Sequence, residues 1–222
     1  RSLLCNVLCY EQEGKYQIIL IKEISPLSNW TDDKIVTLIK SRLDDYRFNH
    51  SLNVADSARE LALRYGGDAD KAYTAGLLHD VMKNASEEEQ LGVLSEAGIE
   101  LMPVEKANKK LWHAMAGAAY IKFVMGIDDR EIIRAVRYHT TGRAEMSLLE
   151  KIVYLADYIS AERNYNGVED MRRLCEKDMD SAIEYALVFG IPDLVSKGQV
   201  IHPDSIDLYN EIIIKKQGGN SL

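Results

Sequence analysis

The sequence has few cysteines, with only Cys5, Cys9 and Cys175 among its 222 residues. An odd number of cysteines does not build a disulfide framework, so we expect reduced thiols and a cytoplasmic protein. Cys5 and Cys9 could supply two ligands of a metal site, but the chain has no second cysteine pair to complete it. A structural zinc site made of cysteines is therefore not expected.

Long hydrophobic runs and an excess of positive charge are also absent. No apolar run approaches the roughly 18 residues of a membrane helix, so we expect no membrane contact. The net charge of −8 argues against a general nucleic-acid-binding surface. A phosphorylated small molecule stays open as a ligand, because a metal ion and a few arginines can make the potential positive inside one pocket. With 46% hydrophobic residues, the chain can bury one substantial core.

Residues 1–30 differ from the rest of the chain. The stretches 7–10 and 16–21 are rich in β-branched and aromatic residues, and the polar segment 11–15 between them predicts a β-hairpin. Pro26 and Ser28-Asn29 then indicate a linker. A lone hairpin is marginal in water, so this extension packs on the body, pairs with a partner or is poorly ordered. We expect the main domain to cover residues 31–216, and residues 217–222 to form a flexible tail.

From residue 31 onward the apolar spacing is helical, which predicts an all-α body. Helix starts are indicated by N-cap residues and capping boxes at Thr31, Asp68, Ser86 with Glu89, Asp128 with Glu131, and Ser147 with Glu150. Gly66-Gly67 and Gly98 indicate helix ends. The segment Gly190-Ile191-Pro192 predicts a break or kink, and the last helix is expected at about residues 204–214.

His79 and Asp80 follow a predicted helix over residues 69–78. Neighbouring residues within a regular helix point in different directions, so an adjacent pair can converge on one ion only where the helix ends. The loss of the helical pattern after residue 80 fits that requirement. The pair alone is weak evidence, because His-Asp is a common dipeptide. It therefore needs support from ligand-type residues elsewhere in the chain.

Further ligand-type residues lie on other predicted helices or at their ends, at His50, His113, His139 and Asp157. Asp157 lies in an apolar and aromatic run, where an unpaired charge is costly to bury, so a metal ion is its simplest partner. The alternative is an exposed carboxylate on the polar face of an amphipathic helix. Each histidine alone is more often a hydrogen-bonded core or surface residue, and we interpret His202 in this structural way. Together the residues predict a helical metal site of imidazole and carboxylate, which suits zinc, iron or manganese.

These positions carry a resemblance to a known family. The order His50, His79-Asp80, Asp157 resembles the H…HD…D signature of the HD-domain metal-dependent phosphohydrolases, an all-α helical bundle. His113 and His139 fall where dinuclear members of that superfamily carry additional ligands. The segments 47–51, 76–80, 137–143 and 148–159 are similar to the bacterial YqeK family of symmetrical bis(5'-nucleosyl)-tetraphosphatases. This similarity extends over roughly residues 30–216 and does not include the N-terminal extension.

The resemblance implies two adjacent metal ions. His50, His79, Asp80 and Asp157 would hold the first ion, and Asp80 would bridge to a second ion held by His113 and His139. Iron is the expected metal, in a centre with one or two sites filled, and manganese and zinc are alternatives. The implied reaction is the symmetrical cleavage of diadenosine tetraphosphate to two ADP by a metal-activated hydroxide. The absence of a glycine-rich phosphate loop is consistent with such a metal-centred design.

Several side chains are expected to work beside the metal ligands. We predict catalytic roles for Asp80, Lys83, His113 and His139. Substrate contacts are predicted for Arg47, Lys83, His113, His139, Thr140, Thr141, Arg143 and Arg163. For each arginine and for Lys83 the alternative is a solvated surface charge.

Two other functions stay open at this point. One is another HD-domain nucleotidase or phosphodiesterase, with the same metals and a different pocket. The other is a metal-bound nucleotide sensor that binds without cleaving. The sequence also leaves a monomer and a homodimer open.

Overall fold

The computed structural model describes residues 7–12, 15–20 and 29–219. Strand β1 (Val7–Gln12) pairs antiparallel with β2 (Lys15–Leu20), and Val7 lies opposite Leu20. The predicted hairpin is therefore present as a two-stranded sheet. The predicted linker residues Pro26 and Ser28 lie outside the described residues.

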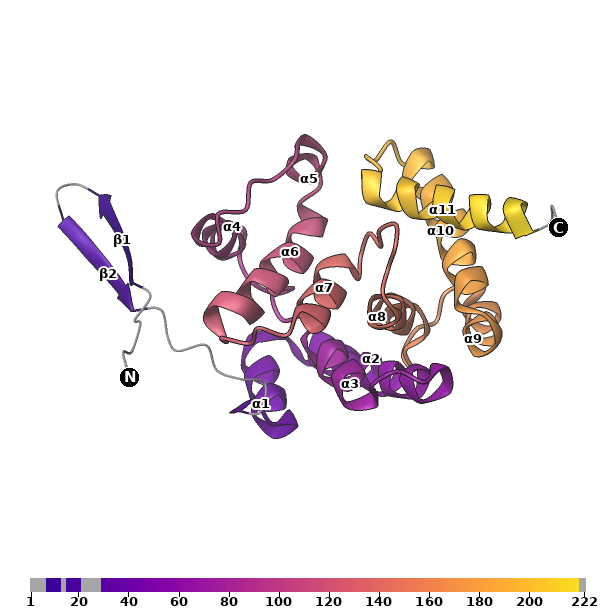
Figure 1. The fold of residues 1–222 in the computed structure, drawn as a ribbon, viewed down its shortest axis with the longest axis horizontal. Helices are drawn as coiled ribbons and strands as arrows, with labels where there is room; N and C mark the ends of the chain where they lie inside the picture. Colours follow the sequence, from indigo (N-terminus) through magenta and orange to yellow (C-terminus); the bar gives the residue numbers. More distant parts are fainter. Residues whose placement is uncertain (1–6, 13–14, 21–28, 220–222) are drawn as a thin grey trace.

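The body is all-α, as the sequence predicts (Figure 1). The α-helices are α1 (Asp32–Arg42), α2 (Asp45–Tyr65), α3 (Ala69–Leu78), α4 (Glu87–Glu96), α5 (Pro103–Ala107), α6 (Trp112–Ala119), α7 (Arg130–Tyr138), α8 (Leu148–Ile159), α9 (Val168–Lys177), α10 (Met179–Ser196) and α11 (Pro203–Gly219). A 3-10 turn, η2 (Lys109–Leu111), precedes α6, and a π-helical turn, η3 (Tyr120–Val124), follows it. None of the described helices combines the length and hydrophobicity that a bilayer crossing requires.

Most of the predicted helix starts are confirmed by cap hydrogen bonds. The Thr31 hydroxyl accepts from the Lys34 amide, and Asp68 caps α3 at the predicted position. Ser147 and Glu150 form the predicted reciprocal capping box of α8. These local signals are reliable because a cap needs only its own next three residues.

Two capping predictions are corrected. Asp129, not Asp128, caps α7, since its carboxylate accepts from the amides of Glu131 and Ile132. Ser86 caps α4, but the Glu89 side chain does not complete a box because it pairs with Arg42, 2.6 Å away. The ion pair with Arg42 therefore replaces the hydrogen bond that the Glu89 side chain would make in a capping box.

The C-terminal helices also differ from the prediction. Helix α10 is unbroken through Pro192, so the expected break is absent, while the alternative of a kink stays a prediction. A proline removes one hydrogen bond to the carbonyl four residues earlier, and Val188 is exposed, so water can satisfy that carbonyl. Helix α11 runs to Gly219, beyond the predicted end near residue 214, so the predicted tail begins inside it.

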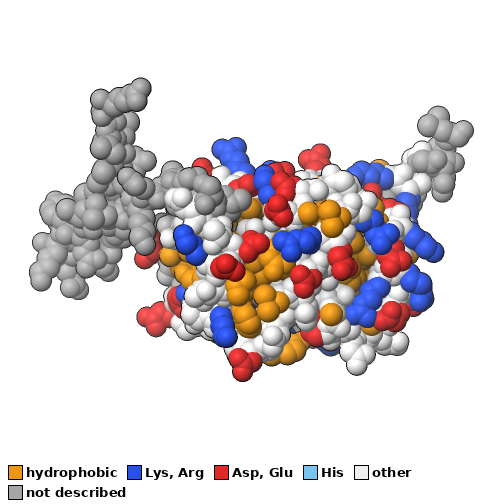
Figure 2. Space-filling model, turned by 90° about the horizontal axis from the view of Figure 1, so that it is seen from below, with side chains coloured by type: hydrophobic (Ala, Val, Ile, Leu, Met, Phe, Trp, Pro, Cys, Tyr) orange, Lys and Arg blue, Asp and Glu red, His pale blue; other side chains and the backbone are white. Residues whose placement is uncertain are grey.

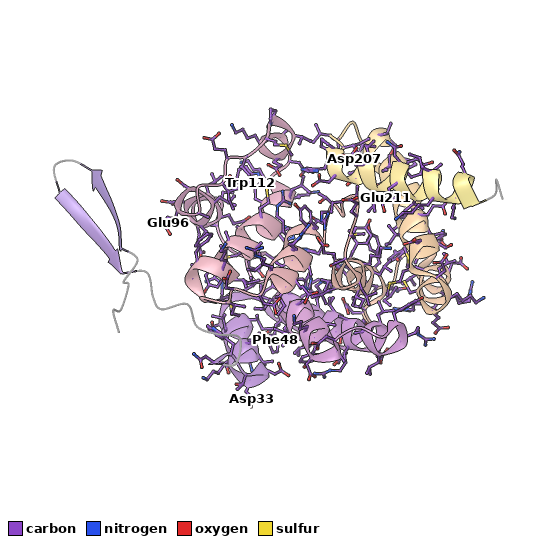
Figure 3. All side chains as sticks on the ribbon, viewed as in Figure 1. Asp33, Phe48, Glu96, Trp112, Asp207 and Glu211 are labelled. Atoms are coloured by element: carbon purple, nitrogen blue, oxygen red, sulfur yellow. The ribbon has the colours of Figure 1, made fainter. Side chains whose placement is uncertain are left out.

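The interior is formed where α2, α3, α7 and α8 pack against one another, with α6 beside α7. Small residues in α6 permit this approach, since a β-carbon at Gly117 would lie 3.3 Å from Val136 of α7. Trp112, at the start of α6 (Figure 3), is buried and donates its indole N–H to the carbonyl of Glu105 in the middle of α5. These contacts bring the ends of several helices to one place.

The face at the bottom of Figure 1, formed largely by α1, α2 and α3, carries acidic and basic side chains side by side. Figure 2 shows hydrophobic side chains between them at several places. No block of positive charge covers this face, in keeping with the net charge of −8.

The contact between α2 and α3 is close because Gly76 has no side chain. A β-carbon at residue 76 would lie 2.6 Å from the Cα of Ala55 and 2.9 Å from its amide nitrogen, both backbone atoms of α2. Backbone cannot move aside as a flexible side chain can. The Gly76 carbonyl also accepts a hydrogen bond from the His79 ring, so the contact positions that histidine as well.

We predict that Gly76→Ala lowers the free energy of unfolding by at least about 3 kcal/mol, because the methyl group forces α2 and α3 apart. The matched control is Gly92→Ala in α4, where the added β-carbon meets no atom within 4 Å. Helix propensity should make that variant more stable by about 0.5–1 kcal/mol. Urea denaturation measures both values, and equal effects of the two substitutions would contradict this packing.

Candidate metal centre

The six residues predicted as metal ligands meet in one buried region. His50 comes from α2, His79 and Asp80 follow α3, His113 lies on α6, His139 follows α7 and Asp157 lies on α8. All are buried except Asp157, whose side chain is 21% exposed. The predicted convergence of helices far apart in the chain is therefore observed.

The first part of the cluster joins His50, His79 and Asp157. The Nε2 atoms of the two histidines are 3.2 Å apart, and Nε2 of His50 lies 3.1 Å from Oδ1 of Asp157. One donor atom from each of the three residues lies within 4.8 Å of the others. This spacing suits donor atoms that surround one ion.

Asp80 lies between this part and a second pair of histidines. Its Oδ2 faces Nε2 of His79 at 3.6 Å and of His50 at 3.9 Å. Its Oδ1 faces Nε2 of His113 at 3.2 Å and of His139 at 3.6 Å. The carboxylate thus offers one oxygen to each histidine pair.

The ring orientation of two histidines is set by the helices that they end. Nδ1 of His79 donates to the Gly76 carbonyl, and Nδ1 of His139 donates to the Val136 carbonyl, both at 2.7 Å. These are carbonyls of a last helical turn, which lack partners within the helix. With the proton on Nδ1, each ring leaves its Nε2 lone pair facing the cluster, as metal ligation requires.

Burial controls the protonation of the cluster. It lowers the pKa of His79 and of His113 to about 4, so both imidazoles are neutral near pH 7. Burial alone would raise the pKa of Asp80, but His79, His113, His139 and Lys83 outweigh it and hold that pKa well below its usual value. Neutral imidazoles and an ionised carboxylate are the forms that bind metal.

A buried oxygen of Asp80 gives a further reason why a metal ion fits these residues. Oδ1 of Asp80 is buried and has no hydrogen-bond partner among the described residues. A charged oxygen in that position is costly unless a cation or donor satisfies it. Four imidazoles and two carboxylates form a donor set suited to a transition metal rather than to magnesium or calcium.

Glu162 belongs to the cluster, although it is absent from the ligands expected on the basis of the sequence. Its carboxylate contacts Nδ1 of His50 and accepts hydrogen bonds from Asn53 at 2.7 Å and from Ser160 at 2.8 Å. Burial would lower the pKa of His50, but Asp157 and Glu162 outweigh it and raise that pKa. The only sequence signal was position, since Ser160 and Glu162 follow the helix of Asp157 directly.

Three of the predicted cations lie at the cluster. Arg47 Nη1 is 3.1 Å from Asp80 Oδ2, and Lys83 Nζ is 3.1 Å from Nε2 of His113. Arg163 pairs with the Asp157 carboxylate and donates from Nε to the Asp157 carbonyl at 2.7 Å. Burial lowers the pKa of Lys83, although the nearby Asp80 opposes this shift.

Arg143 and Thr141 are engaged elsewhere. The Arg143 guanidinium binds both carboxylate oxygens of buried Glu150, at 2.7 and 2.8 Å, and donates to the Ala144 carbonyl. The Thr141 hydroxyl donates to the Gly142 carbonyl. His202 is buried beside Glu105, 3.4 Å away, which agrees with its structural interpretation. Among the predicted substrate contacts Thr140, Thr141 and Arg143, it is Thr140 that lies beside the cluster, in a cavity that His139 and Asp157 also line.

A cavity of about 310 Å³ adjoins the cluster. It is lined by four polar side chains and three aromatic ones, His139, Thr140, Asp157 and Arg163 together with Tyr158, Tyr165 and Phe189. The Thr140 hydroxyl is buried and has no hydrogen-bond partner among the described residues. The cavity therefore gives a ligand access to two residues of the cluster.

The HD domain family model matches residues 47–162, the range that contains all six clustered residues. The chain therefore belongs to the HD domain family, and the resemblance stated from the motifs is confirmed.

Individual proteins of known name are similar to this chain over more than four fifths of its length. It is 37% identical to a symmetrical bis(5'-nucleosyl)-tetraphosphatase of Halalkalibacterium halodurans, over 83% of this chain and 98% of the relative. The enzyme of that name from Bacillus subtilis is 36% identical, over 82% of this chain and 97% of the relative. A crystal structure of a predicted HD superfamily hydrolase involved in NAD metabolism from Clostridium acetobutylicum is 38% identical. It covers 84% of this chain and 98% of its own, with a TM-score of 0.81.

We predict that His79→Ala removes most of the bound metal, because the variant loses a preoriented donor. The matched control is His202→Ala, which removes a histidine of similar burial that lies outside the cluster. Elemental analysis of both proteins, purified without chelator, measures the metal per chain. Full metal content in His79→Ala would contradict the location of the centre.

The metal-free protein should lose stability between about pH 6.5 and pH 4. His79 and His113 have a folded pKa of about 4, against 6.5 in an unfolded chain, so acidification protonates the unfolded state first. The raised pKa of His50 acts in the opposite direction but on one group only. Urea midpoints measured with chelator across this range test the sign, and a constant midpoint from pH 7 to pH 5 would contradict it.

Proposed function

We propose that this protein hydrolyses diadenosine tetraphosphate symmetrically to two ADP. The observation that carries the proposal is the buried Asp80 carboxylate, which faces one histidine pair with each oxygen. Such a bridging position is what a two-metal phosphohydrolase needs. The relatives that cover most of the chain, named symmetrical bis(5'-nucleosyl)-tetraphosphatases, support the choice of substrate.

In this proposal the clustered residues hold two metal ions. His50, His79, Asp80 and Asp157 would hold the first ion, and Asp80, His113 and His139 would hold the second. Bound there, the metal supplies Lewis acidity toward a phosphoryl oxygen and a water with a lowered pKa. Iron as the metal stays a prediction, with manganese and zinc as the alternatives that the donors also suit.

The charges around the cluster favour a polyphosphate ligand. Three carboxylates, those of Asp80, Asp157 and Glu162, are balanced by three cations, Arg47, Lys83 and Arg163. Any bound metal ion therefore makes the pocket positive, although the whole chain carries −8. A chain of four phosphates is strongly anionic and complements such a pocket.

The protein side chains position the phosphates and compensate their charge. Arg47 Nη1 lies 3.1 Å from Oδ2 of Asp80 and Lys83 Nζ lies 3.7 Å from its Oδ1, so the N–H groups of both can donate to phosphate oxygens bound beside the cluster. The Thr140 hydroxyl, without a protein partner among the described residues, can donate to another phosphate oxygen. The oxygen of a water bonds to one of the two central phosphorus atoms, the bond from that phosphorus to the central bridging oxygen breaks, and the proton released by the water is available to the departing ADP.

The remaining expectations stay predictions. A cytoplasmic location is predicted from the cysteine content, and a homodimer stays open. The contacts of Arg143 and Thr141 with substrate also stay predictions, although both side chains have protein partners here.

The metal-loaded protein is expected to convert diadenosine tetraphosphate to ADP alone, without AMP or ATP, as measured by anion-exchange chromatography. Asp80→Asn should lower the rate by more than about 100-fold, because changes of residues that only support metal ligands already cost 10–100-fold. His202→Ala, outside the cluster, should keep the rate within a few fold.

A panel of nucleoside monophosphates and cyclic nucleotides provides the comparison. Faster turnover of a panel member would assign the protein to another HD-domain activity. Tight ADP binding without any product over hours, with metal supplied, would favour a nucleotide sensor instead.

A further inference from the structure

The cavity beside the cluster combines a polar and an aromatic lining. His139, Asp157 and Arg163 connect it to the cluster, whereas Tyr165 and Phe189 line it with rings. The mechanism proposed above uses the polar part only. The aromatic part therefore needs an explanation of its own.

Phe189 on α10 is 53% exposed, although it lies next to a pocket. Its ring and that of Tyr165 have centroids 6.2 Å apart and an angle of 36° between their planes. The Tyr165 hydroxyl donates to the Tyr158 carbonyl at 3.1 Å, which holds that ring in place. Together, Tyr165 and Phe189 form an aromatic platform that is fixed on one side and open to ligand on the other.

We propose that this platform binds the nucleobase of one half of the substrate. The proposal rests on the proposed function, since it places the base of the same dinucleotide. The two rings are already at aromatic contact distance, so a base stacks on the platform rather than between the rings. Stacking on phenylalanine and tyrosine is the usual way in which proteins hold an unpaired base.

The position of the platform fits a nucleotide as a whole. Arg163 lies in the same cavity and at the same time pairs with Asp157 of the cluster, so a phosphate beside the guanidinium is next to the reacting position. The cavity of about 310 Å³ continues from there to the rings. A nucleoside diphosphate can thus place its phosphates at Arg163 and its base at Phe189.

The platform also lies outside the region shared with the whole family. The HD domain match ends at residue 162, and Arg163, Tyr165 and Phe189 all follow it. The helical core common to the family then supplies the phosphate chemistry, and the segment between α8 and α9 together with α10 supplies the contact with the nucleoside.

The test compares ADP with pyrophosphate, which has no base, as ligands of the metal-loaded protein in isothermal titration. Phe189→Ala and Phe189→Leu should weaken ADP binding about 5- to 150-fold, the loss of one base stack. Pyrophosphate binding should stay within about twofold. Phe189→Tyr keeps a ring and should restore ADP binding.

Phe123 on η3 provides the matched control, because it is 54% exposed and does not line the cavity. Phe123→Ala should bind ADP and pyrophosphate as the unaltered protein does. Unchanged ADP binding in Phe189→Ala, or an equal loss for ADP and pyrophosphate, overturns the proposal.

The hydrolysis assay is scored separately. If the unaltered protein binds ADP through Phe189 but does not cleave diadenosine tetraphosphate, the proposed function fails and the base-binding platform stands.

Discussion

The structure depends on a carboxylate that is buried among imidazoles. Asp80 is 2% exposed, and its two oxygens face histidines from four different helices or helix ends. An ionised group at such a depth is unfavourable without a compensating charge. Arg47 and Lys83 provide part of that charge, and a metal ion would provide the rest. The surrounding helices bury this group, while the neighbouring His139 and Asp157 line a cavity that a ligand can enter.

The helix ends carry much of this arrangement. His79 and His139 each follow the last residue of a helix and donate to a carbonyl of that same helix. One interaction therefore gives a carbonyl of the last helical turn a side-chain partner and fixes a tautomer. The close contact at Gly76 couples the first of these ends to α2, the helix that carries His50. The same close contact between α2 and α3 therefore packs the two helices and positions His79 relative to His50.

The clustered residues and the aromatic residues of the cavity come from different parts of the sequence. Residues 47–162 contain the clustered histidines and aspartates and match the HD domain family. After them, Arg163 and Tyr165 in the segment between α8 and α9, together with Phe189 on α10, complete the lining of the cavity. One fold can act on several substrates when the reactive residues lie in the core and the residues that contact the rest of the substrate lie outside it.

The sequence by itself determined the helical body, most of the caps and six of the clustered residues, but not Glu162. Periodicity and caps report on neighbours within a few positions, which explains why Asp68 and Ser147 were placed correctly. Only the tertiary structure decided which side chains meet across helices. It pairs Glu162 with His50, takes Arg143 to Glu150 and places Phe189 at the cavity. These outcomes depend on the angles at which the helices cross and on which of several polar partners each side chain meets after folding. Neither can be read from the residues next to it in the sequence.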